Sequence, residues 1–69
     1  MLNGKRIMEI LKTSGMSATR VAADAQISVT ALYNIVNGAD AKISTATRLA
    51  KSLGVPLSEI LADEEVSNG

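Results

Sequence analysis

The sequence contains no cysteine, histidine, tryptophan or phenylalanine, and Tyr33 is its only aromatic residue. Without cysteine the chain can form no disulfide, and without cysteine and histidine it lacks the usual ligands of zinc. The absence of histidine also removes the commonest general base of enzymes, and no nucleophile has a recognisable base beside it. We therefore expect no metal site, no cofactor and no enzymatic activity.

Long apolar runs are also missing. No segment approaches the roughly 18 to 20 residues that cross a bilayer, and the run Ile7-Met8 between Arg6 and Glu9 is too short for a signal peptide. We therefore expect a cytoplasmic protein with no membrane partner. The 69 residues suffice for one small core. Without Phe or Trp, that core must come from Ile, Leu, Val, Met and Ala, which favours thin, closely packed helices.

Charge is distributed unevenly although the formal net charge is zero. Residues 1–51 contain all seven Lys and Arg and three carboxylates, a net charge of +4, whereas residues 52–69 contain four carboxylates and no base. A basic body can present a positive face to phosphate, although the same charges can also serve only to solvate helix surfaces. Residues 63–69 are acidic and lack an apolar face, so we expect a disordered tail after a folded domain over 1–62.

The most informative segment runs from Ser17 to Gly38, where two short helical patterns meet at a break. Ser17 begins the first pattern, whose small apolar residues form one narrow face that permits close packing. Gln26 and Ile27 interrupt it, and Ser28 then caps the second pattern. The apolar residues of this second pattern point one way and its polar residues point the other. The segment is therefore predicted to be a helix-turn-helix.

Further caps and stops place the other helices. Asn3 is the predicted N-cap of a first helix, which Gly15 ends in the left-handed conformation. Ser44 is the predicted cap of a fourth helix that reaches Leu53 and stops at the following glycine. Pro56 fits the first turn of a fifth helix, where its missing N–H costs nothing. Together these signals predict an all-α domain of five helices.

Several short steps in the chain fit one known pattern. Gly15-Met16-Ser17 precedes the second predicted helix, and Ala22 lies where the paired helices are expected to touch. The turn ends in Ile27-Ser28, the third helix contains Leu32 and Ile35, and Asn37-Gly38 follows it. With the later stretch from Leu49 they resemble the phage Cro and repressor family of helix-turn-helix domains. The resemblance covers about fifty residues, from about Leu11 to Leu61, and implies a compact, lambda-repressor-like fold.

The resemblance also implies a site on double-stranded DNA, with the helix at about 28–36 in the major groove. Four residues occupy the base-facing positions of the family: Val29, Thr30, Tyr33 and Asn34. Asn34 can pair with adenine, Thr30 can bond to either kind of base edge, and Val29 can touch a thymine methyl group. Phosphate contacts are implied for a second set: Ser17, Thr19, Ser28, Asn37 and Lys42.

The residues themselves leave some of these roles open. Val29 lies toward the flank of the buried arc, so a core role is about as well supported as a base contact. The predicted recognition helix contains no Arg or Lys, and Ala39-Asp40-Ala41 replaces the basic residues usual after Asn-Gly, so bidentate reading of guanine is unavailable from this helix. Gln26 stands where the family turn often has Gly, and we expect it to approach positive φ at a cost of roughly 1 kcal/mol.

We expect a sequence-specific DNA-binding transcriptional regulator, in the first place a repressor that binds a palindromic operator as a homodimer. The predicted fifth helix is the first candidate for the dimer surface, although its apolar residues can also serve the core: Val55, Leu57, Ile60 and Leu61. The alternative is a helix-turn-helix domain used as a protein-interaction module, such as an adaptor or antitoxin-like partner. An outward Tyr33 on an uncharged helix and the zero net charge suit that alternative.

Overall fold

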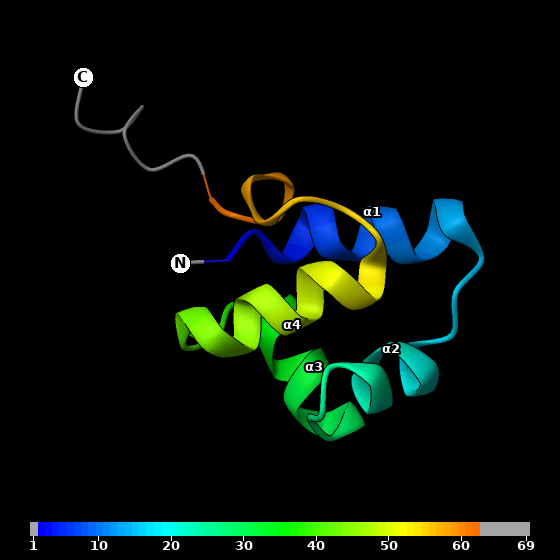
Figure 1. Ribbon diagram of the computed structural model, residues 1–69, viewed down its shortest axis with the longest axis horizontal. Coiled ribbons are helices and arrows are strands. Elements are labelled where there is room, and N and C mark those ends of the chain that lie inside the picture. Colours follow the sequence, from blue (N-terminus) through cyan, green and yellow to red (C-terminus); the bar gives the residue numbers. More distant parts are fainter. Residues whose placement is uncertain (1, 63–69) are drawn as a thin grey trace.

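The computed structural model describes residues 2–62 and contains four α-helices followed by a short 3-10 helix (Figure 1). The helices are α1 (Gly4–Ser14), α2 (Ala18–Asp24), α3 (Val29–Val36) and α4 (Ile43–Leu53), and the 3-10 helix is η1 (Leu57–Glu59). The all-α prediction is confirmed for this part of the chain. The predicted tail, 63–69, lies outside the described residues. None of the described helices has the length and apolar character to span a membrane.

The prediction of a fifth α-helix was wrong. The segment closes only a 3-10 turn, in which the Glu59 N–H donates to the Pro56 carbonyl at 3.0 Å. Pro56 itself is the extended residue before the turn, with φ −67° and ψ 154°, and not the first helical residue. The turn cannot continue because Leu61 forms an antiparallel bridge with Leu2, at the opposite end of the described chain. The Asn3 N–H donates to the Ile60 carbonyl beside this bridge, at 2.8 Å.

Three predicted N-caps are confirmed by hydrogen bonds from the first helical turn. The Asn3 side chain accepts from the Arg6 N–H at 3.1 Å, and the Ser17 hydroxyl accepts from the Arg20 N–H at 3.0 Å. Ser28 accepts from the third N–H of α3 in the same way, also at 3.0 Å. Each cap therefore satisfies one backbone donor that the helix itself cannot pair.

The predicted cap of α4 was wrong by two residues. The helix begins at Ile43, so Ser44 lies inside it, and Lys42 occupies the cap position without a side-chain cap bond. The reason is that the Lys42 carbonyl already accepts the Ala46 N–H at 2.9 Å, which starts the helical bonding before Ser44. The ammonium group of Lys42 cannot accept a hydrogen bond, so α4 begins without a side-chain cap.

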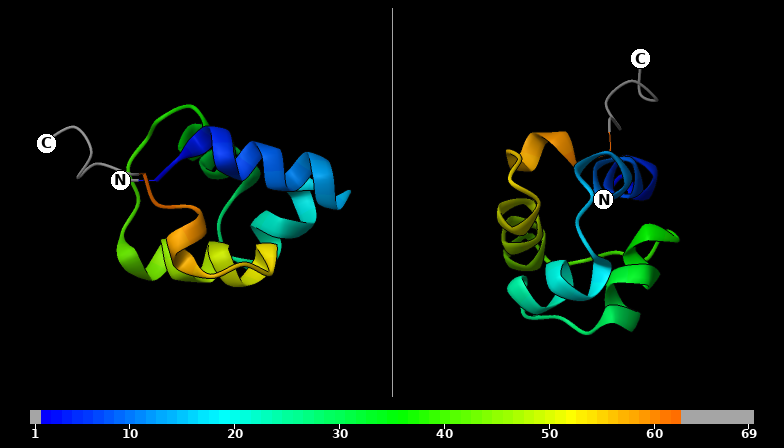
Figure 2. Two further views of the ribbon diagram at one scale, coloured as in Figure 1. Left: turned by 90° about the horizontal axis from the view of Figure 1, so that it is seen from above. Right: turned by 90° about the vertical axis from the view of Figure 1, so that its right-hand side faces the viewer.

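A single apolar core lies between the helices. Figure 2 shows them around this core, with α1 opposite α2 and α3 opposite α4. The largest fully buried side chains come from each of the four α-helices and from the end of η1: Ile7, Val21, Leu32, Leu49 and Ile60. Small residues fill the contacts of α2 with α3 and α4, among them Ala22, Ala25, Ala46 and Ala50. This packing follows from a core without large aromatic side chains, in which helices must approach closely to leave no void.

The turn between α2 and α3 is a Schellman motif with a non-glycine residue at its left-handed position. Gln26 has φ 62° and is the only non-glycine residue with positive φ among residues 2–62. Its N–H donates to the Ala23 carbonyl at 3.1 Å, and the Ile27 N–H reaches back to the Ala22 carbonyl at 3.0 Å. The predicted left-handed conformation at Gln26 is therefore confirmed, and it satisfies the carbonyls at the end of α2.

We predict that Gln26→Gly leaves the free energy of unfolding unchanged or raises it by up to about 1 kcal/mol, because glycine adopts positive φ without strain. Gly54 supplies the matched control, since it occupies the same motif at the end of α4 with φ 75° and has open space around its Cβ position. Gly54→Gln should therefore lower the free energy of unfolding by about 1 kcal/mol. Urea denaturation measures both variants. A clear loss of stability in Gln26→Gly contradicts the strain argument.

A close approach of two backbones fixes α1 against α3. A Cβ atom on Gly4 would overlap the carbonyl oxygen of Val36 and come within 2.9 Å of its Cα atom. Only glycine therefore permits this approach, because the obstacle is backbone and cannot rotate away. The first turn of α1 is in this way held against the last turn of α3.

We predict that Gly4→Ala lowers the free energy of unfolding by about 1–3 kcal/mol, although alanine has the higher helix propensity by about 1 kcal/mol. Separation of α1 from α3 outweighs the gain in propensity. Lys5→Ala, at the exposed neighbouring position, should change stability little. Thermal unfolding followed by circular dichroism distinguishes the two variants, and equal melting temperatures mean that the helices do not meet at Gly4.

Candidate nucleic-acid interface

The helix-turn-helix unit consists of α2, the Schellman turn and α3. Its inner side is formed by Val21, Ala22, Leu32 and Ile35, all of which are buried. A side chain of α4 also holds the turn in place, because Arg48 Nε donates to the Ala25 carbonyl at 3.0 Å. The position of α3 relative to α2 is therefore set by packing on one side and by a hydrogen bond from outside the unit.

The outer side of α3 presents an uncharged polar arc. Thr30, Tyr33, Asn34 and Asn37 are all exposed, as the helical spacing predicts. We call this set the recognition arc. Val29 differs from them because it is half-buried and packs against the core. The core role that the sequence left open for Val29 is therefore present in the structure, and only part of its side chain is available to a ligand.

The two flanks of the recognition arc differ in character. On one flank Tyr33, which is 44% exposed, borders a shallow hollow of about 250 Å³ between α1 and the start of α2. That hollow is lined by apolar residues and one cation: Met8, Leu11, Met16, Ala18 and Lys12. On the other flank, Asn34 borders a hollow that also includes Asp40 and Thr45. One flank is therefore apolar with a cation and the other has a carboxylate. Sequence reasoning did not single out Lys12.

The residues expected to contact phosphate lie at or near the ends of α2, α3 and α4. Ser17 and Thr19 are exposed at the start of α2, and Ser28 is exposed before α3. The capping hydroxyls accept the backbone bonds described above, and each retains its own O–H as a donor. Asn37 ends α3, and Lys42 precedes α4 across the connecting loop. All five are accessible side chains on or beside the helix-turn-helix.

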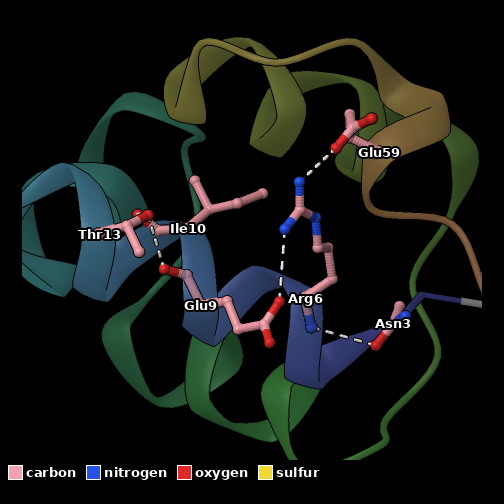
Figure 3. A network of polar contacts seen from close by, with 6 residues as sticks. All are labelled: Asn3, Arg6, Glu9, Ile10, Thr13 and Glu59. Carbon is pink, nitrogen blue, oxygen red and sulfur yellow. Dashed lines mark hydrogen bonds and ion pairs between the residues drawn. The ribbon is translucent and has the colours of Figure 1, made fainter.

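Two arginines, Arg6 and Arg48, form contacts within the fold. Arg6 pairs with Glu59 of η1 at 2.6 Å and with Glu9 at 3.4 Å (Figure 3). The hydrogen bond that Arg6 donates to Glu59, followed by the one it donates to Glu9, raises the pKa of the Arg6 guanidinium above its ordinary value. The pair is exposed to solvent, so it orients η1 more than it stabilises the domain. Arg48 is occupied by its bond to Ala25.

This arrangement of a rigid corner and an outward polar helix defines a domain of the helix-turn-helix class. A family model described as helix-turn-helix matches residues 7–60 of the chain. The chain belongs to the helix-turn-helix family of the Cro/C1 type, whose domains are DNA-binding transcription regulators. Neither the curated proteins nor the solved structures yielded a match to the chain.

We predict that Asp40→Asn strengthens binding to every duplex by up to about fivefold at low salt, because a carboxylate beside the recognition arc repels phosphate. Asp24→Asn makes the same change in net charge away from that flank, where Asp24 lies 3.9 Å from Arg20. Asp24→Asn should therefore raise the affinity for DNA less than Asp40→Asn does. Fluorescence anisotropy at two salt concentrations measures both variants. Equal gains in affinity would assign the effect to net charge alone.

Proposed function

We propose that the protein is a sequence-specific regulator that represses transcription by binding a palindromic operator as a homodimer, with α3 in the major groove. The observation that carries this proposal is the recognition arc, an uncharged polar surface on a helix fixed by α2 in a chain of the helix-turn-helix family. Hydroxyl and amide groups on such a surface can bond to base edges in the major groove.

Each residue of the site has a distinct role in this proposal. Asn34 pairs its amide with N6 and N7 of adenine, and Thr30 bonds to a neighbouring base edge. Tyr33 and the exposed part of Val29 contact bases on the other flank, where a thymine methyl group suits the valine. The phosphate backbone is held by the second set of residues: Ser17, Thr19, Ser28, Asn37 and Lys42. These contacts orient α3 and contain no sequence information.

A homodimer is proposed because one recognition helix buries too little surface for the usual affinity of a specific regulator. Of the apolar residues considered for the dimer surface, Ile60 is fully buried, and Val55 and Leu57 pack against the core. Only Leu61 remains exposed, at 36%, and Ile43 at the start of α4 is more exposed, at 66%. We therefore propose Leu61 and Ile43 as the apolar residues first to be tested for a dimer contact.

A protein partner is the second candidate function, supported by one feature of the site. Tyr33, the only aromatic residue, stands beside an apolar hollow, and α3 contains no charge. Aromatic residues next to apolar hollows are typical of protein-binding surfaces. In this alternative the recognition arc and the hollow contact another polypeptide instead of a base edge.

Enrichment of duplexes from a random pool at low salt distinguishes the two functions. A DNA-binding regulator should enrich one sequence, and a dimer should enrich it as two inverted half-sites about one helical turn, or a multiple of it, apart. Sedimentation of the protein with the enriched duplex then gives the number of bound protomers. Failure to enrich any sequence rejects the proposed regulator in favour of the protein-interaction module.

We predict that Asn34→Ala relaxes the preference at one or two operator positions, with a loss of about 1–3 kcal/mol at each. Lys42→Ala should instead weaken all duplexes alike and make the salt dependence shallower by about one phosphate contact. The difference arises because an amide reads a base, whereas an ammonium group displaces counterions. Binding to the enriched duplex and to single-base variants of it measures both effects. A uniform loss in Asn34→Ala contradicts base reading.

A further inference from the structure

The recognition helix lacks the cations that bind the DNA backbone. Residues 28–37 contain no Lys or Arg, and the guanidinium groups of Arg6 and Arg48 are engaged within the fold. Non-specific attraction to DNA comes almost entirely from Lys and Arg that neutralise phosphates. Cations for this purpose must therefore come from elements beside α3.

The element that lies closest to α3 on the Tyr33 flank is α1. The approach of Gly4 to Val36 holds the start of α1 against the end of α3. Farther along α1, Met8 and Lys12 line the same hollow as Tyr33. Lys5, Met8 and Lys12 recur at intervals of three and four residues, so they form one stripe along α1. We call these three residues the α1 stripe.

The α1 stripe is cationic and accessible. Lys5 and Lys12 are both exposed, and neither forms an ion pair with a carboxylate of residues 2–62. The acidic residue of α1, Glu9, is four residues from Lys5 and three from Lys12, so it borders the stripe, but its carboxylate accepts from Arg6 and not from either lysine (Figure 3). Lys5 and Lys12 therefore have no paired carboxylate among residues 2–62, and the counterion of each lysine is solvent or a ligand.

We infer that the α1 stripe forms the phosphate-binding edge of the DNA interface, with Lys12 as its principal contact and Lys5 as the second. The inference rests on the proposed function. Packed helices lie about 8–10 Å apart, and the major groove is about 12 Å wide, so a helix packed beside one that occupies the groove lies above the phosphates of its rim. The long side chains of the two lysines then extend toward the backbone. Met8 lines the apolar hollow that Lys12 and Tyr33 also border.

The test compares two lysines in equivalent local positions. Lys12 is in the last turn of α1 and Lys51 is in the last turn of α4, and both are exposed. Lys51 lines a hollow with Asp24 and Arg48, away from the recognition arc. Each lysine can stabilise the end of its own helix, so the melting temperatures of Lys12→Gln and Lys51→Gln should fall by similar small amounts. Any difference between the two variants in affinity for DNA then reflects where each lysine lies relative to the recognition arc.

Binding of the full chain is measured by anisotropy between about 50 and 200 mM salt, with the duplex enriched from the random pool and a duplex of scrambled sequence. Lys12→Gln should weaken both duplexes by the same factor and reduce the slope of log K against log salt by about 0.9 for each bound protomer. Lys5→Gln should act in the same direction. Lys12→Arg should retain the slope of the unmodified protein, and Lys51→Gln should leave it unchanged.

An unchanged slope in Lys12→Gln overturns the inference while the proposed function stands, provided that the unmodified protein still enriches a sequence. An equal fall in slope for Lys51→Gln also overturns it, because the effect would then follow net charge and not position. If the unmodified protein binds neither duplex at low salt, the inference and the proposed function fail together.

Discussion

The geometry of the domain depends on the corner between α2 and α3, where the chain turns through a single left-handed residue. Gln26 at φ 62° lets the last carbonyls of α2 bond to the turn, and α3 begins three residues later. The small residue Ala22 then permits the two helices to touch. Because α2 has only seven residues and α3 only eight, neither helix is stable without this packing. The direction of the recognition arc follows from the corner.

The cations of the domain divide into those that maintain the fold and those that remain free to meet a ligand. Arg6 joins α1 to η1, and Arg48 joins α4 to the end of α2. Guanidinium groups suit these positions because they form directed hydrogen bonds to carboxylate or carbonyl oxygens. The exposed lysines form no such bonds within the described residues. A lysine is a mobile point charge, which suits a contact with phosphate whose exact position varies along DNA.

The recognition arc combines exposed, uncharged polar groups with charges placed on its flanks. Lys12 borders the Tyr33 flank and Asp40 borders the Asn34 flank, so the electrostatic field across α3 is asymmetric. A duplex approaching this face is attracted on one side and repelled on the other. In the proposed function, this asymmetry favours one placement of the backbone relative to α3. Affinity and sequence preference are then controlled by different side chains.

Local signals in the sequence determined the N-caps at Asn3, Ser17 and Ser28, the left-handed Gln26 and the outward positions of α3, because hydrogen bonds and helical spacing over a few residues decide them. Contacts between distant residues decided the rest. The bridge of Leu61 to Leu2 limited the last element to a 3-10 turn. The approach of Gly4 to Val36 placed Lys12 beside Tyr33. No spacing along the chain encodes such neighbours, since they arise only when the helices pack.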